Sequence, residues 1–388
     1  MYLSRKLLDA ITTAEPVNGF THGFYRYPAR FSPLFVRAII EKFTNPGDVI
    51  LDPFMGGGTT MVEARALGRN AIGCDLNTLA VFLSKTKTTV FQSSEIAQVR
   101  EWAQALPSKL NAFTDKLIPT EISLNGMDGR DTWRLRKAIQ LSLRSLNQLK
   151  KSRTRNLARC IILRAAQWAL DCRSTLPTIP EFRNQLMLAS EEILRGATDF
   201  LEIVQSRVKN GCATRVTCIN RSASTLNSHP IWARVGSPRL ILTSPPYPGV
   251  HVLYHRWQIR GRQETAVPYW IAGTIDGNGA SFYTFGDRKQ KHLSNYFRLA
   301  EETFSSVASL CDDNSLIVQM VAFSEPDVQL PRYLEAMNNA GLREVRITSC
   351  VHESGSRIWR QVPNRKWYAE QKAGIGSASE VVLFHRKL

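Results

Sequence analysis

Several common signatures are missing from this sequence of 388 residues. It has no Cys-x-x-Cys pair, and its seven cysteines are scattered and odd in number. This argues against a disulfide framework or a zinc ribbon and is typical of a reducing cytosol. No run of 18 apolar residues occurs, so no membrane span is predicted. The first residues include acids and lack an apolar segment, unlike a signal peptide. We therefore expect a cytoplasmic protein that does not bind membranes.

Acidic residues are few compared with basic ones. The chain has 50 Lys and Arg against 33 Asp and Glu, which gives a net charge of +17 and a pI near 9.8. A strongly basic balance favours an anionic partner, most often nucleic acid, although a merely soluble basic protein is the alternative. Apolar residues make up 43% of the chain, enough to build a buried core.

The order of the periodic segments indicates an α/β fold. A β-branched run ending at Asp52 precedes the glycine cluster 56–58, and a helical pattern at 59–67 leads to a second strand pattern at 70–75. Strand, glycine turn, helix and strand form half of a doubly wound, Rossmann-like sheet. A helix is expected before this unit at 33–43, and further strands at 215–219, 239–247, 315–323 and 380–385.

The middle of the chain departs from this alternation of strand and helix patterns. Residues 92–210 have almost no strand signal and apolar spacing typical of helices. We therefore divide the chain into residues 1–91, a mainly helical insertion at 92–210, and residues 211–388. Basic residues crowd the insertion and form a candidate nucleic-acid-binding face, with a solvated helix face as the alternative. The candidates are Arg134, Lys137, Arg144, Lys150, Lys151, Arg153 and Arg155, together with Arg360, Arg365 and Lys366 near the end of the chain.

The glycine turn, LDPFMGGGTT, has the features of a ligand site. Its glycines let the backbone approach a ligand, and Thr59 begins a helix whose N–H groups would face that ligand. Asp75 closes the next strand, where an acid can accept both hydroxyls of a ribose. Neither the spaced G-x-G-x-x-G nor a Gly-Lys-Ser/Thr motif is present. The pattern therefore favours a nucleoside-containing cofactor, and a tight turn without a ligand is the alternative.

A second motif, Thr243-Ser244-Pro245-Pro246-Tyr247, ends another predicted strand. Methylation of an exocyclic amino group needs acceptors for its two protons, because the nitrogen lone pair is delocalised into the ring. The Ser244 hydroxyl and the Pro245 carbonyl can be those acceptors, and Pro246 fixes the backbone because it lacks an N–H. Tyr247 offers a flat face for an extruded base. A proline-capped edge strand with a core tyrosine is the alternative.

Together the two motifs resemble those of the DNA amino-methyltransferases, the S-adenosylmethionine-dependent enzymes that make N4-methylcytosine or N6-methyladenine. The resemblance implies S-adenosyl-L-methionine as cofactor, double-stranded DNA as partner, and a base flipped into the site. It assigns catalysis to Ser244, Pro245, Pro246 and Tyr247. It assigns cofactor contacts to Asp52, Pro53, Phe54, Gly56, Gly58, Thr59 and Asp75, to His22 and Phe31 in a looser motif, and to Ser222 beside the adenine.

The resemblance leaves several points open. Ser244 favours N4-cytosine, because adenine enzymes of the family more often carry Asp or Asn there. Family analogy also suggests a cognate restriction or phage-defence protein. The alternatives are an RNA base amino-methyltransferase and a non-catalytic DNA-binding protein on the same fold. Base reading is expected from the insertion, with the loop 248–290 as the rival.

No metal site is expected. His251 and His255 are four residues apart and lack a third ligand. No Pro-Cys dipeptide is present, so the covalent cysteine route to C5-methylcytosine lacks its nucleophile motif.

Overall fold

A computed structural model gives the three-dimensional structure of the chain. The described residues are 1–13, 15, 17–27, 31–111, 124–127, 129, 131–173, 175–248, 256–259, 263–275, 285, 293–349, 357–361 and 379–388; for 349 and 361 only the backbone is described. Four residues named above lie outside them: His251, His255, Arg365 and Lys366.

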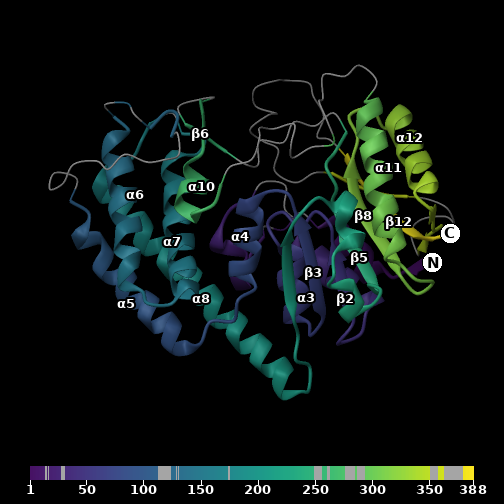
Figure 1. The fold of residues 1–388 in the computed structure, drawn as a ribbon, viewed down its shortest axis with the longest axis horizontal. Coiled ribbons are helices and arrows are strands. Elements are labelled where there is room, and N and C mark those ends of the chain that lie inside the picture. Colours follow the sequence, from purple (N-terminus) through teal and green to yellow (C-terminus); the bar gives the residue numbers. More distant parts are fainter. Residues whose placement is uncertain are drawn as a thin grey trace.

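The centre of the molecule is a mostly parallel sheet with the strand order β11-β12-β8-β5-β2-β3-β4 (Figure 1). Strands β4, β3, β2, β5 and β8 run parallel, whereas β12 is antiparallel to β8, β11 and β9. The bounds are β2 Val49–Asp52, β3 Asn70–Asp75, β4 Val216–Asn220, β5 Leu240–Thr243, β8 Leu316–Ala322, β9 Leu342–Glu344, β11 Ile358–Gln361 and β12 Ser379–Lys387.

This strand order confirms the predicted fold class. From β2 the chain moves outward to β3 and β4, and it then returns to place β5 on the other side of β2. A reversal of this kind defines a doubly wound sheet, and ligands bind at the reversal, outside the carboxyl ends of the strands.

Helices cover both faces of the sheet, which explains why its strands read as continuous apolar runs. Every residue of β8 is buried. Neighbouring strand residues point to opposite faces, so Ile50 packs with α1 and α2, while Leu51 packs with α11 and α12. The covering elements are α1 Arg5–Thr12, α2 Pro33–Phe43, α3 Thr59–Ala66, η3 Ala223–Ser228, α9 Trp232–Val235, α11 Ser294–Ser309 and α12 Pro326–Asn339, with the short pair β1 Tyr2–Leu3 and β10 Thr348–Ser349.

A helical body lies beside the β4 end of the sheet, next to α4 (Figure 1). It draws on three stretches of the chain, because the insertion helices share one apolar core with residues before and after them. Its elements are α4 Thr78–Lys87, α5 Ser93–Lys109, α6 Trp133–Ser145, η2 Leu146–Gln148, α7 Ser152–Leu170 and α8 Ile179–Lys209, joined by η1 Phe20–Phe24, the hairpin β6 Trp257–Ile259 and β7 Gln263–Thr265, and α10 Val267–Ala272.

In the described parts of the chain, no helix is both long enough and apolar enough to span a bilayer.

Candidate active site

The two sequence motifs meet where the strand order reverses. Strands β2 and β5 are hydrogen-bonded neighbours, and one motif follows each of them. The Thr243 hydroxyl at the end of β5 donates to Asp52 Oδ1 at the end of β2, with an O···O distance of 2.7 Å. This contact joins residues 191 positions apart and defines the centre of the candidate site.

The glycine turn after β2 has a backbone that only glycine adopts easily. Gly56 and Gly58 have φ angles of +44° and +76°. A Cβ on Gly58 would lie 2.5 Å from Ser84 Oγ, and one on Gly56 would lie 3.3 Å from the Tyr27 ring. The buried Lys87 ammonium donates to the Gly57 carbonyl at 2.7 Å. The turn is therefore packed against α4 through Ser84 and Lys87, and its Gly56 lies close to the Tyr27 ring.

The Asp75 carboxylate lies at the end of β3 and faces this turn. It accepts hydrogen bonds from the Gly56 N–H at 2.9 Å and the Asn77 N–H at 2.8 Å. Burial raises the pKa of Asp75 to about 6, and these N–H groups oppose the shift. Burial also raises the pKa of Asp52 to about 6, against the hydrogen bond from Thr243. Two carboxylates with raised pKa values thus lie at the switch point, as is common in functional sites.

The loop after β5 is held by side chains from distant parts of the chain. Ser244 Oγ donates to the Tyr247 hydroxyl at 3.0 Å, and that hydroxyl donates to Glu380 Oε1 at 2.8 Å. The Tyr296 hydroxyl of α11 donates to the Pro246 carbonyl at 2.7 Å. Ser244 and Tyr247 are partly exposed, so both side chains can reach a substrate at this edge of the sheet.

Comparison with known proteins finds a match for the part of the site that contains the glycine turn. Residues 10–85, which hold the glycine turn and Asp75, match the family described as DNA methylase. Over this segment the chain is similar to the DNA amino-methyltransferases. The loop 243–247 lies outside the matched residues.

The chain is similar to three curated methyltransferases over short stretches. It is 31% identical over 96 residues to the Type II methyltransferase M.MjaII of Methanocaldococcus jannaschii, covering 25% of this chain and 18% of the relative. It is 40% identical over 108 residues to M.BsoBI of Geobacillus stearothermophilus, covering 27% and 21%. For the DNA adenine methyltransferase YhdJ of Escherichia coli (strain K12) the values are 31% over 81 residues, 20% and 28%. The matches span less than a third of each relative.

The family implies S-adenosyl-L-methionine as the cofactor, and the residues at this edge fit it. Asp75 can accept ribose hydroxyls, and the glycine turn leaves room for a ligand against its backbone. Ser32, at the start of α2, has a buried hydroxyl with no hydrogen-bond partner among the described residues. It closely follows Tyr27, whose ring packs against Gly56. A polar ligand at this end of α2 would satisfy that hydroxyl.

The other predicted cofactor residues lie around the turn. The Phe54 N–H donates to Asp52 Oδ1 at 3.1 Å, and its ring packs against Phe285. Ser222 follows β4, beside the end of β3, and its hydroxyl accepts the Ser224 N–H. Of the three remaining residues, Pro53 and Thr59 are buried, and Phe31 packs on Phe35 at the start of α2.

His22, another predicted cofactor residue, lies in a buried polar cluster. Its ring is 1% exposed, and its Nε2 lies 2.8 Å from Glu63 Oε1 of α3. Glu63 also accepts from Arg37 of α2 at 2.9 Å. His22 therefore belongs to a buried polar cluster that joins η1, α2 and α3.

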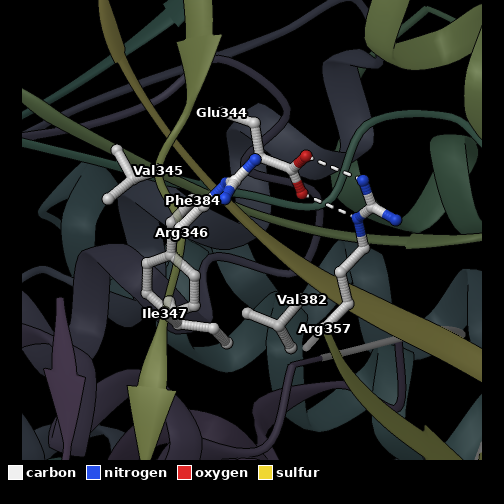
Figure 2. A pocket seen from close by; sticks show the side chains of 7 residues that line it. All are labelled: Glu344, Val345, Arg346, Ile347, Arg357, Val382 and Phe384. Atoms are coloured by element: carbon white, nitrogen blue, oxygen red, sulfur yellow. Dashed lines mark hydrogen bonds and ion pairs between the residues drawn. The ribbon is translucent and has the colours of Figure 1, made fainter. Parts of the chain in front are cut away.

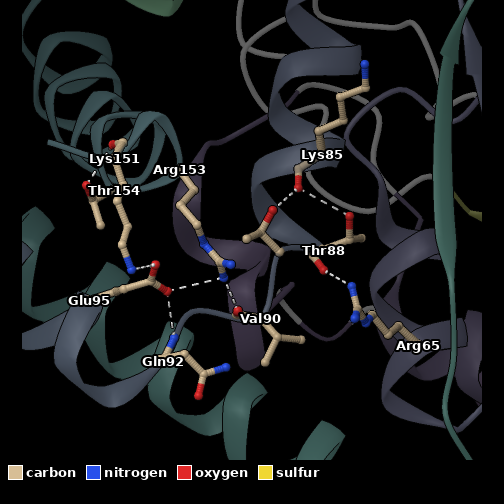
Figure 3. A network of polar contacts seen from close by, with 10 residues as sticks. Arg65, Lys85, Thr88, Val90, Gln92, Glu95, Lys151, Arg153 and Thr154 are labelled. Carbon is tan, nitrogen blue, oxygen red and sulfur yellow. Dashed lines mark hydrogen bonds and ion pairs between the residues drawn. The ribbon is translucent and has the colours of Figure 1, made fainter.

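Burial also corrects two of the predicted nucleic-acid contacts. Lys137 is 1% exposed and Arg360 is 7% exposed, so neither side chain can reach a phosphate. Lys151 and Arg153 form ion pairs with Glu95 of α5 at 3.1 and 3.3 Å (Figure 3). Arg153 also donates to the Val90 carbonyl. These two cations hold α7 against the start of α5.

The remaining basic residues lie at two different ends of the helical body. Gly126, just before α6, approaches Ile259 and Gln263 of the β6–β7 hairpin. Arg134 therefore lies in the first turn of α6, near the β6–β7 hairpin. Arg144 and Lys150 are exposed at the other end of α6, where α7 begins. Arg155, in the second turn of α7, is half-buried.

The direction of α7 shows the same separation. The helix starts beside Glu95 and ends at Asp171, which accepts the Gln258 N–H of β6 at 3.1 Å. Its 19 residues span ~28 Å. Lys151 and Arg153 thus lie at the end away from the hairpin.

Sequence patterns missed three residues of the site. Glu380 lies in β12, where it reads only as one polar residue in an apolar strand. Tyr296 reads as an apolar position of α11, and Thr243 as the last residue of β5. Only Thr243 had a signal, because it belongs to the TSPPY motif itself. The other two join the site through tertiary contacts.

A pocket at the far edge of the sheet contains none of the predicted site residues. Figure 2 shows it beside β9, β11 and β12, where Arg357 forms two hydrogen bonds with Glu344, at 2.7 and 2.8 Å. Its lining residues are Glu344, Val345, Arg346, Ile347, Arg357, Val382 and Phe384. Among the described residues, no group of three His, Cys, Asp or Glu side chains could hold a metal ion.

Proposed function

We propose that the chain transfers a methyl group from S-adenosyl-L-methionine to the exocyclic amino group of a base flipped out of duplex DNA, with N4 of cytosine favoured. The hydrogen bond between Thr243 and Asp52 carries this proposal, because it joins the cofactor turn and the TSPPY loop at one edge of the sheet. The cofactor supplies an electrophilic methyl group when bound. The residues of the loop supply acceptors for the amino protons.

The loop geometry supports these roles. The nitrogen must become tetrahedral as it attacks, so its two protons need acceptors that are already in place. Ser244 Oγ and the Pro245 carbonyl are the two candidates. Pro246 cannot donate a backbone hydrogen bond, and Tyr296 fixes its carbonyl at 2.7 Å. The Tyr247 ring, anchored through its hydroxyl, offers a face for the extruded base.

The proposal is tested by incubating the protein with unmethylated duplex DNA and labelled S-adenosyl-L-methionine and then analysing the nucleosides. N4-methylcytosine is the expected product, because Ser244 stands where adenine enzymes of the family more often carry Asp or Asn. N6-methyladenine would overturn the choice of base. Label in RNA but not in DNA would overturn the choice of substrate. The absence of both transfer and cofactor binding would indicate a non-catalytic scaffold.

A restriction or defence partner is part of the same proposal. It is supported only by the relatives, two of which are named as Type II methyltransferases. We expect DNA methylated by this chain to resist a nuclease from the same cells that cuts the unmethylated sequence. Equal cutting of both DNAs would leave a methyltransferase that acts without a cognate nuclease.

We expect Arg134 to contact a DNA phosphate and Arg144 not to do so. Arg134→Ala should lower the slope of log affinity against log salt by about 0.9, the value for one phosphate contact on duplex DNA. Arg144→Ala is the matched control, because it removes the same exposed charge ten residues further along α6, ~15 Å from the hairpin end. Titrations of duplex DNA at several salt concentrations measure both slopes. Equal slopes for the two variants would contradict the placement.

A further inference from the structure

The hydroxyl of Ser244 is one end of a hydrogen-bond chain that crosses the sheet. Ser244 Oγ donates to the Tyr247 hydroxyl, and Tyr247 donates to Glu380 Oε1, with O···O distances of 3.0 and 2.8 Å. Glu380 lies near the start of β12, which is separated from β5 only by β8. Tyr247 and Glu380 are 133 residues apart in sequence, so only the fold brings these hydrogen-bonding groups together.

The carboxylate of Glu380 is itself held in place. Arg360 Nε of β11 lies 3.0 Å from Glu380 Oε2, and the two side chains are only 5% and 8% exposed. Arg360 also donates to the Ile11 carbonyl of α1 at 3.2 Å. A buried carboxylate is costly unless an opposite charge and hydrogen bonds compensate for it. Arg360 provides the opposite charge, and Tyr247 provides a hydrogen bond to Glu380 Oε1.

We propose that Glu380 is a positioning residue that keeps Ser244 an acceptor for the protons of the target amino group. This inference rests on the proposed function. A carboxylate only accepts hydrogen bonds, so Glu380 obliges Tyr247 to donate to it. The Tyr247 oxygen then accepts the proton of Ser244. Since a serine hydroxyl has one proton and two lone pairs, both lone pairs of Ser244 stay available for the substrate.

Without the carboxylate, the hydrogen bond between Ser244 and Tyr247 can reverse its direction. Tyr247 would then donate to Ser244 and occupy one of the lone pairs that the substrate needs. The charge of Glu380 also polarises the two hydroxyls in series, which makes Ser244 Oγ a stronger acceptor as positive charge develops on the amino nitrogen. Glu380 thus acts on the reaction only through the hydroxyl of Tyr247.

A double-mutant cycle tests this route. Tyr247→Phe and Glu380→Gln should each lower the single-turnover rate of methyl transfer about tenfold. The double variant should be no slower than Tyr247→Phe alone, because the effect of Glu380 requires the hydroxyl. The affinities for S-adenosyl-L-methionine and for duplex DNA should not change. The acceptor is plasmid DNA from a host without methyltransferases.

Glu380→Gln also leaves the buried Arg360 without its counter-ion, which can lower stability for an unrelated reason. Arg360→Met combined with Glu380→Gln removes both charges and should show the same tenfold loss of rate. Thermal unfolding of each variant reports stability separately. If Glu380→Gln slowed transfer equally in the Tyr and Phe backgrounds, Glu380 would act through packing and the positioning role would be wrong.

Two different outcomes separate an error in the positioning role from an error in the proposed function. A wild-type protein that binds S-adenosyl-L-methionine but methylates no plasmid DNA would overturn both, because Ser244 would then have no DNA base to serve. Wild-type transfer together with full rates in Glu380→Gln and Tyr247→Phe would overturn only the positioning role.

Discussion

Replacing Ser244 with Ala should lower methyl transfer about 100-fold or more while leaving cofactor affinity unchanged. Positive charge develops on the amino nitrogen as it attacks, so an acceptor that is already aimed at its proton is worth most in the transition state. Loss of one such prepositioned hydrogen-bonding group typically costs about 10²–10³ in rate. Among the described residues, the Ser244 hydroxyl bonds to Tyr247 and not to the glycine turn, so the turn keeps its shape in the variant. Single-turnover transfer of labelled methyl groups measures the rate, and calorimetry measures the affinity.

Ser309→Ala provides the matched control for this variant. Ser309 lies on α11, and its hydroxyl donates to the Ser306 carbonyl of the same helix. It should retain the wild-type rate. If Ser244→Ala also transferred methyl groups at the wild-type rate, Ser244 would not be the acceptor, and the Pro245 carbonyl would have to serve the amino group alone.

The sequence predicts the sheet well because its signals are local. The expected strand 70–75 and helix 33–43 have the bounds of β3 and α2 in the structure. A strand buried on both faces needs a continuous apolar run, and a tight turn with positive φ needs glycine. Each requirement involves only a few consecutive residues. Gly56 and Gly58, both with positive φ, are examples of the second.

The basic face could be predicted only in part, because charge says nothing about partners that are distant in sequence. Arg134 and Lys137 are three residues apart on α6, yet one is exposed and the other is 1% exposed. Lys151 meets a carboxylate 56 residues earlier, at Glu95. The sequence alone therefore does not show that Lys137 is buried or that Lys151 is paired with a carboxylate.

The candidate site shows the same limit. The motifs predict the residues on the two loops, since each motif is contiguous. The residues that orient these loops come from elsewhere: Glu380 from β12, Tyr296 from α11 and Tyr27 from the segment after η1. In a single sequence, these residues resemble ordinary core positions. Their role becomes visible only in the folded sheet, where at most two strands lie between any two of β2, β5 and β12.

Asp75→Ala should have the opposite effect to Ser244→Ala, weakening cofactor binding and leaving the loop 243–247 intact. The carboxylate lies at the turn and can accept ribose hydroxyls, a charge-assisted contact worth roughly 1.5–3 kcal/mol. The affinity for S-adenosyl-L-methionine should therefore fall about 10- to 100-fold. Calorimetry on the protein without DNA measures this directly. An unchanged affinity would place the ribose elsewhere along the turn.

The pH dependence of binding gives an independent check on Asp75. Burial raises its pKa to about 6, so the free protein is protonated at this position below that pH. A protonated carboxyl is a poorer acceptor, so cofactor affinity should be highest above pH 6 and should fall as the pH drops through it, by at most about tenfold per pH unit for one proton. Asp52 titrates in the same range. The Asp75→Ala variant should therefore lose most of this pH dependence, and any part that remains should disappear when Asp52→Asn is added to it. A wild-type affinity that is flat from pH 5 to 8 would mean that neither carboxylate changes its protonation state when the cofactor binds.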